Sequence, residues 1–141
     1  RIFDVGYAVR PCDIWSDILL PLMREGDRLQ YVEIPCHWYE TGSFPDYLEA
    51  TRDALHLSQT PEFKSTFAHY FKQSGSELIQ SPKCLLLRHH LVRIGKNVHF
   101  EGCAVLGANS TIGDGAVIND CVIGEGISVP ANASLQKEFL L

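Results

Sequence analysis

Residues 98–135, V-H-F-E-G-C-A-V-L-G-A-N-S-T-I-G-D-G-A-V-I-N-D-C-V-I-G-E-G-I-S-V-P-A-N-A-S-L, decide the fold, because one small-x-aliphatic unit recurs along them. The units are spaced by six residues, apart from one step of five between Ile118 and Ile123. A period of six is neither the 3.6 of a helix nor the 2 of a simple strand. The pairs are Val98/Phe100, Ala104/Leu106, Ser110/Ile112, Ala116/Ile118, Cys121/Ile123, Ile127/Val129 and Ala133/Leu135.

Short strands joined by tight corners satisfy this period, since each hexad supplies one flat side and one bend of a triangular coil. The aliphatic residue then points inward, and the small residue two positions earlier shares its face because strand side chains alternate. Cys121 occupies such a small inward position, so we expect it to be buried. Four glycines follow the inward residue, and we expect them where the backbone bends in a conformation that a side chain would oppose. They are Gly95, Gly107, Gly113 and Gly124.

The repeat resembles the hexapeptide-repeat family, whose members form a left-handed parallel β-helix; the left hand comes from this resemblance alone. Seven hexads predict a little over two coils. So short a stack cannot bury its end coils alone and should pack against another domain or subunit, which favours a homo-oligomer. The step of five predicts a tightened corner near residues 119–122.

Composition excludes several classes of protein. The 141 residues carry a net charge of −5 with only 12 scattered Lys and Arg, which argues against a nucleic-acid surface. No apolar run approaches the ~20 residues that cross a bilayer, and we expect neither a leader nor a membrane contact. Five cysteines without a C-x-x-C pair favour a reducing cytoplasm over a disulfide scaffold.

The chain before the repeat predicts an alternation of strands and helices. Strands are expected at residues 2–9 and 29–34, with a helix over residues 14–24 that Asp13 caps and Pro21 divides. A second helix should open after Ser43, which forms a capping-box-like start with Asp46. Further along we expect a helix at 61–73 with an aromatic stripe that packs, a connector at 78–82 and a strand at 83–92.

Residues 38–50, W-Y-E-T-G-S-F-P-D-Y-L-E-A, resemble a segment near the end of the catalytic domain in sugar-1-phosphate nucleotidyltransferases, W-x-D-x-G-T/S-P-x-x-Y/F-L-x-A. This family includes the mannose-1-phosphate guanylyltransferases. Residues 3–7, F-D-V-G-Y, resemble its [FV]-N-x-G-x-Y strand, and residues 17–26 resemble the short helical connection between the two segments. A β-helix often follows in that family.

The resemblance implies an α/β remnant, the end of a nucleotidyltransferase α/β domain, followed by a short left-handed parallel β-helix. The domains expected are 1–58 for the α/β portion, 59–93 for a helical connector, 94–136 for the β-helix and 137–141 for an apolar tail.

Three positions carry over from the resembled family. Glu40 stands where the family has a magnesium-binding aspartate, and Asp4 and Gly6 stand in the strand that contacts the sugar. A sugar phosphate or nucleotide sugar is the ligand this implies. No G-x-G-T-R-like loop is present, so this chain alone is expected to have no catalytic residues, no bound cofactor and no turnover; Mg²⁺ belongs to the complete enzyme.

Two other functions stay open. A stand-alone oligomerisation or regulatory module is favoured by the apolar residues Phe139-Leu140-Leu141 after an open coil. A hexapeptide acyltransferase would use a histidine as general base, and His99, at an outward step of the first coil, is the candidate.

Overall fold

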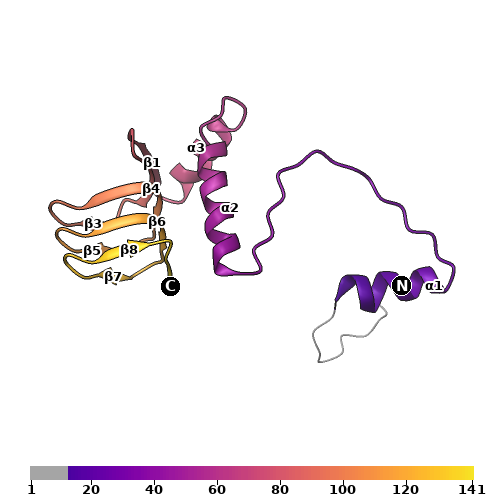
Figure 1. Cartoon of the computed structure of the whole chain (residues 1–141). Helices are drawn as coiled ribbons and strands as arrows, with labels where there is room; N and C mark the ends of the chain where they lie inside the picture. The colour runs from indigo at the N-terminus through magenta and orange to yellow at the C-terminus, as the bar shows by residue number, and fades with distance from the viewer. Residues whose placement is uncertain (1–12) are drawn as a thin grey trace. The chain divides into compact units, whose positions relative to one another are not determined.

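The computed structural model describes residues 13–141 and divides the chain into two compact units, Arg1–His37 and Trp38–Leu141 (Figure 1). The strand expected at residues 2–9 lies outside the described residues. No helix within residues 13–141 combines the length and apolar composition that a bilayer crossing requires.

In the first unit, a π-helix at Ile14–Leu19 leads into helix α1, Leu20–Arg24. The Asp13 carboxylate caps the π-helix as expected, because it accepts a hydrogen bond from the Ser16 backbone N–H at 2.7 Å. Pro21 lies in the first turn of α1 and has no N–H to donate to the preceding turn, and the helix changes from π to α hydrogen bonding at this point. Gly26, with φ +88°, follows the end of α1.

The strand prediction for residues 29–34 is wrong, because residues 27–41 contain neither helix nor strand. A strand exists only where a neighbouring backbone accepts and donates its hydrogen bonds. None of the described residues pairs with this segment, and the side chains of Tyr31, Val32 and Ile34 are exposed.

The second unit is built on a parallel β-solenoid of about three turns (Figure 1). Strands β3, β5 and β7 form one flat side of the solenoid. Strands β4 and β6 each bend at a corner, so that each contributes to the two other sides. Strand β8 extends one of these sides and β9 extends the other. The solenoid strands are β2 Cys84–His89, β3 Arg93–Ile94, β4 His99–Leu106, β5 Thr111–Ile112, β6 Val117–Ile123, β7 Ser128–Val129, β8 Ser134–Gln136 and β9 Phe139–Leu140.

The expectation of little more than two coils is too low. Strand β2, which was expected only to lead into the first coil, pairs in parallel with β4 and forms a side of its own. Strand β9 pairs with β6 and completes the last turn. The residues Cys84, Leu86 and Leu140 pack into the same core as the repeat, although their hexads lie outside the regular pattern.

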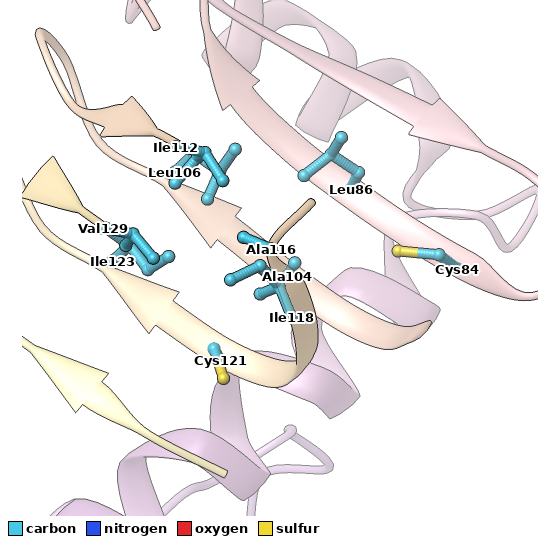
Figure 2. Close-up of a cluster of buried hydrophobic side chains, with 10 residues drawn as sticks. All are labelled: Cys84, Leu86, Ala104, Leu106, Ile112, Ala116, Ile118, Cys121, Ile123 and Val129. Atoms are coloured by element: carbon cyan, nitrogen blue, oxygen red, sulfur yellow. The ribbon is translucent and has the colours of Figure 1, made fainter. Parts of the chain in front are cut away.

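Figure 2 shows the buried core of the solenoid, most of which the repeat predicts. Small and aliphatic side chains alternate inward on successive sides, and each residue of the set is at most 2% exposed. The set comprises Ala104, Leu106, Ser110, Ile112, Ala116, Ile118, Cys121 and Ile123. Of the predicted inward residues, Val98, Phe100, Ile127, Ala133 and Leu135 are only partly buried.

The glycines after the inward residue serve a different purpose from the expected one. Gly113 does not have a positive φ; a Cβ there would lie 2.7 Å from Ala131 Cα and 2.7 Å from Pro130 C, in the backbone of the next turn. Close stacking of turns therefore excludes the side chain. The left-handed backbone conformation falls instead on corner residues such as Asn97, Asn109 and Asn132, with φ of 56° to 59°.

The predicted tightened corner is confirmed. Strands β4 and β6 pair with a register shift, because Gly102 and Cys103 lie where β6 has only Asp120. Asp120 is left-handed at φ 50°. The third turn repeats this shorter corner at Lys137, φ 53°, between Leu135 and Leu140.

Two helices cover the outside of the solenoid. Helix α2, Phe44–Leu57, begins at Ser43, whose hydroxyl accepts from the Asp46 N–H at 3.3 Å, as the predicted cap requires. The Asp46 carboxylate accepts from the Ser43 hydroxyl at 2.6 Å and not from the Ser43 backbone N–H, so the capping box is only half formed. Helix α3 spans Lys64–Gln73. The connector expected at 78–82 is wrong in part, since strand β1, Ser76–Gln80, pairs antiparallel with β2.

A second hydrophobic cluster joins these helices to the outer face of the solenoid. Leu55 of α2, Leu85 of β2 and Cys103 of β4 are its buried members. Phe71 of α3 and Leu78 of β1 pack against them, so one member of the aromatic stripe packs on the solenoid as expected.

Candidate functional site

The residues carried over from the resembled family do not form a site in the described part of the chain. Asp4 and Gly6 lie outside the described residues. Glu40 is exposed ahead of α2, and within residues 13–141 no three His, Cys, Asp or Glu side chains gather as metal ligands. Glu40 would supply one carboxylate to Mg²⁺, which in such sites takes its other ligands from substrate phosphates and water.

His99, the candidate base of the acyltransferase alternative, lies at the start of β4 with an exposed side chain. Its backbone N–H donates to Ala116 O at 2.9 Å and holds the two turns in register. Its ring makes no hydrogen bond or ion pair with residues 13–141. A general base is normally oriented by a further group, and the described residues supply none at His99.

A groove of about 520 Å³ lies between α2 and the tightened corners of the solenoid. Phe44, Leu48 and Arg52 of α2 form one wall. The opposite wall contains Asp120 from the second turn and Glu138 from the third, together with Cys103, Lys137 and Phe139. Its volume lies within the range of small-molecule sites in proteins.

The tightened corners of the solenoid lie along the groove. In the first turn the additional residue Cys103 reaches α2, where its Sγ lies 3.7 Å from His56 Nε2 and packs beside Leu55. In the second and third turns that residue is missing, and α2 contacts β6 of the second turn and Phe139 of the third. Asp120 and Lys137, the left-handed residues of these corners, line the groove.

Aromatic contacts close one end of the groove. The Phe139 ring stacks on Phe44 with centroids 5.2 Å apart and meets Tyr47 edge-on at 4.7 Å. The first turn of α2 is thus held to β9, the last strand of the solenoid. The residues expected to form only an apolar tail after the coil contribute a wall of the groove.

Sequence reasoning did not find this groove. A visible signal was present, because Leu135 to Leu140 repeats the step of five that separates Ile118 from Ile123. Two shortened hexads in succession indicate a line of tightened corners. What the sequence did not reveal was that α2 would lie along that line, since this depends on packing between Leu55 and Leu85.

Burial raises the pKa of the three buried thiols, which lowers the fraction present as thiolate. Burial, with smaller contributions from Cys103 and Asp120, raises the pKa of Cys84 to about 11. Burial is also the first cause that raises the pKa of Cys103 and of Cys121. Cys36, in contrast, is exposed. At pH 8 roughly one Cys84 side chain in a thousand is therefore a thiolate.

We expect iodoacetamide at pH 8 to alkylate Cys36 on the order of a hundredfold faster than Cys84, because only the thiolate attacks and burial also blocks access. Peptide mass spectrometry after timed quenching measures each cysteine separately. The same experiment in urea is the control, where the two rates should converge. Similar rates in the folded chain would contradict the burial of Cys84.

Comparison of the chain with family models, curated proteins and solved structures finds no match.

Proposed function

We propose that this chain is the C-terminal part of a sugar-1-phosphate nucleotidyltransferase, in which the end of an α/β domain is followed by a left-handed β-helix that serves assembly. The observation that carries the proposal is the order of elements: residues 38–50, with their resemblance to the family segment, open the Ser43-capped helix α2, and the β-solenoid follows.

In the complete enzyme, an oxygen of the sugar 1-phosphate attacks the α-phosphorus of a nucleoside triphosphate. The bond to the β-phosphate oxygen breaks, and pyrophosphate leaves as the nucleotide sugar forms. Mg²⁺ supplies charge neutralisation on the phosphates when bound. Glu40 is the residue of this chain proposed to contribute a carboxylate to that ion, and Asp4 and Gly6 are proposed to lie against the sugar.

The isolated chain should not release pyrophosphate from any nucleoside triphosphate, because the phosphate-binding G-x-G-T-R loop is not among its residues. A coupled pyrophosphate assay with several nucleotides and sugar 1-phosphates measures this. Robust turnover by the 141-residue chain would overturn the proposal.

The assembly role is supported by the last turn of the solenoid. Strands β7, β8 and β9 each pair with a strand of the preceding turn, and no described residue pairs with their other edges. Leu141, 82% exposed, lies at the same end beside Gly124. Unpaired strand edges next to exposed apolar side chains favour association with another chain. The alternative of a stand-alone oligomerisation module rests on this same surface.

Light scattering should give a molar mass that is a multiple of 15.8 kDa at tens of micromolar chain. Leu141→Asp should shift the mass toward the monomer, because it replaces an exposed apolar side chain of the proposed interface by a second negative charge beside the terminal carboxylate. Leu91→Asp is the matched control, because Leu91 is 48% exposed and lies in the first turn, away from the last turn. The molar mass of this variant should equal that of the parent chain. A strictly monomeric chain at high concentration would contradict the assembly role.

A further inference from the structure

The groove between α2 and the tightened corners has an apolar side and a negatively charged side. Phe44 and Leu48 of α2 and Phe139 of β9 supply apolar surface. The charged residues that line it are three carboxylates, Glu49, Asp120 and Glu138, and two cations, Arg52 and Lys137.

Two carboxylates lie near the Arg52 guanidinium. It lies 3.8 Å from Glu49 Oε1 and 3.8 Å from Asp53 Oδ1, so its charge is shared between two acids. On the solenoid wall, the two carboxylates of Asp120 and Glu138 are accompanied by one cation, Lys137. The groove is therefore net negative.

Two buried thiols, Cys103 and Cys121, also line the groove. Burial is the first cause that raises the pKa of both. The Asp120 carboxylate adds to the rise for Cys103, while Arg52 acts in the opposite direction. For Cys121, backbone hydrogen bonds with Glu138 and Asn119 lower the pKa, and the Glu138 and Asp120 carboxylates make smaller raising contributions.

Two of these carboxylates keep free acceptor capacity. Asp120 Oδ1 accepts from the Cys103 backbone N–H at 2.9 Å, while no residue within 13–141 donates to its Oδ2. The Glu138 carboxylate makes no hydrogen bond or ion pair with the described residues. Both side chains can accept from a donor that enters the groove.

We propose that this groove binds a small organic cation that carries an apolar group, such as a primary amine attached to an aromatic ring. The ammonium group is held by Asp120 and Glu138, and the apolar group lies against Leu48 and the stacked rings of Phe44 and Phe139. Charge complementarity selects a cation over an anion, and the apolar walls select against a bare metal ion. This inference does not depend on the proposed nucleotidyltransferase relationship or on assembly.

The test uses three probes with the same ring: 2-phenylethylamine, neutral 2-phenylethanol and anionic phenylacetate. Calorimetry on the full chain should show that the amine binds most tightly and phenylacetate most weakly. In a ¹⁵N-labelled chain, the amine should shift the backbone amides of Asp120, Lys137 and Phe139 more than those of Glu77 and Ile112, which lie away from the groove.

Two conservative variants locate the ammonium group. Glu138→Gln and Asp120→Asn should each weaken binding of the amine by roughly fivefold, the upper end for one partly exposed charge pair. Asn at position 120 tolerates the left-handed backbone and still accepts from the Cys103 N–H, so the corner keeps its fold. Glu125→Gln removes the same charge at a different corner and should change the affinity by less than twofold.

Tighter binding of phenylacetate than of the amine would overturn the proposal. So would unchanged affinity for the amine in both Glu138→Gln and Asp120→Asn, or amide shifts confined to residues outside the groove.

Discussion

Replacing Ile118 by alanine is expected to lower the free energy of unfolding by about 2–5 kcal/mol. Ile118 is fully buried at the middle of the solenoid, where its strand pairs with β4 on one side and β8 on the other. Turns above and below hold the surrounding backbone, so the cavity left by the deleted atoms cannot collapse. The loss is a large part of the 5–15 kcal/mol that stabilises a typical domain.

Urea denaturation followed by circular dichroism measures the effect of Ile118→Ala. The matched control is Leu91→Ala, which also removes atoms from an aliphatic side chain, but at a position that is 48% exposed. Its effect should stay within about 0.5–1 kcal/mol. Equal destabilisation by the two substitutions would contradict the inward placement of Ile118.

Gly113→Ala is expected to destabilise the chain by about 1–3 kcal/mol or more, although alanine suits the backbone conformation at this position. The added methyl group would meet backbone atoms of Pro130 and Ala131 in the next turn. Backbone atoms cannot rotate aside as a side chain can, so the two turns must separate. That separation weakens the hydrogen bond from Gly113 N–H to Val129 O, now 2.9 Å.

Gly42→Ala is the control for Gly113→Ala. A Cβ at Gly42 would have only Glu40 Oε1 within 4 Å, at 3.9 Å, and neither glycine has a positive φ. Any difference between the two variants in the urea midpoint therefore reports the close approach of turns. A Gly113→Ala chain as stable as Gly42→Ala would show that the turns are not stacked as tightly as the structure has them.

The features that could be predicted from sequence are those set by local pattern. A strict alternation of small and aliphatic residues every six positions identifies the inward face, because each short strand presents alternate residues to the core. The Ser43 cap, the Asp13 cap and the division at Pro21 are likewise fixed by a few neighbouring residues.

The features that could not be predicted depend on distant partners. Residues 29–34 have the composition of a strand, yet none of the described residues supplies the pairing that a strand needs. The reverse holds for Ser76–Gln80, which has a modest strand pattern but lies against the free edge of β2 and packs Leu78 into the outer cluster.

The groove illustrates the same limit. The shortened corners at Asp120 and Lys137 are visible as two five-residue steps, but α2 lies more than sixty residues earlier in the chain. The burial of Leu55 against Leu85 and Cys103 and the packing of Phe44 on Phe139 bring the two together. The role of the repeat glycines could not be predicted either, because it depends on the close approach of the neighbouring turn and not on their own φ.

The coding sequence immediately upstream of the Arg1 codon tests the nucleotidyltransferase proposal most directly. The proposal predicts that the reading frame continues upstream and encodes further strands and helices of an α/β domain, with a G-x-G-T-R loop after its first strand. An initiation codon directly ahead of Arg1, preceded by an in-frame stop codon, would contradict it and would favour the stand-alone module.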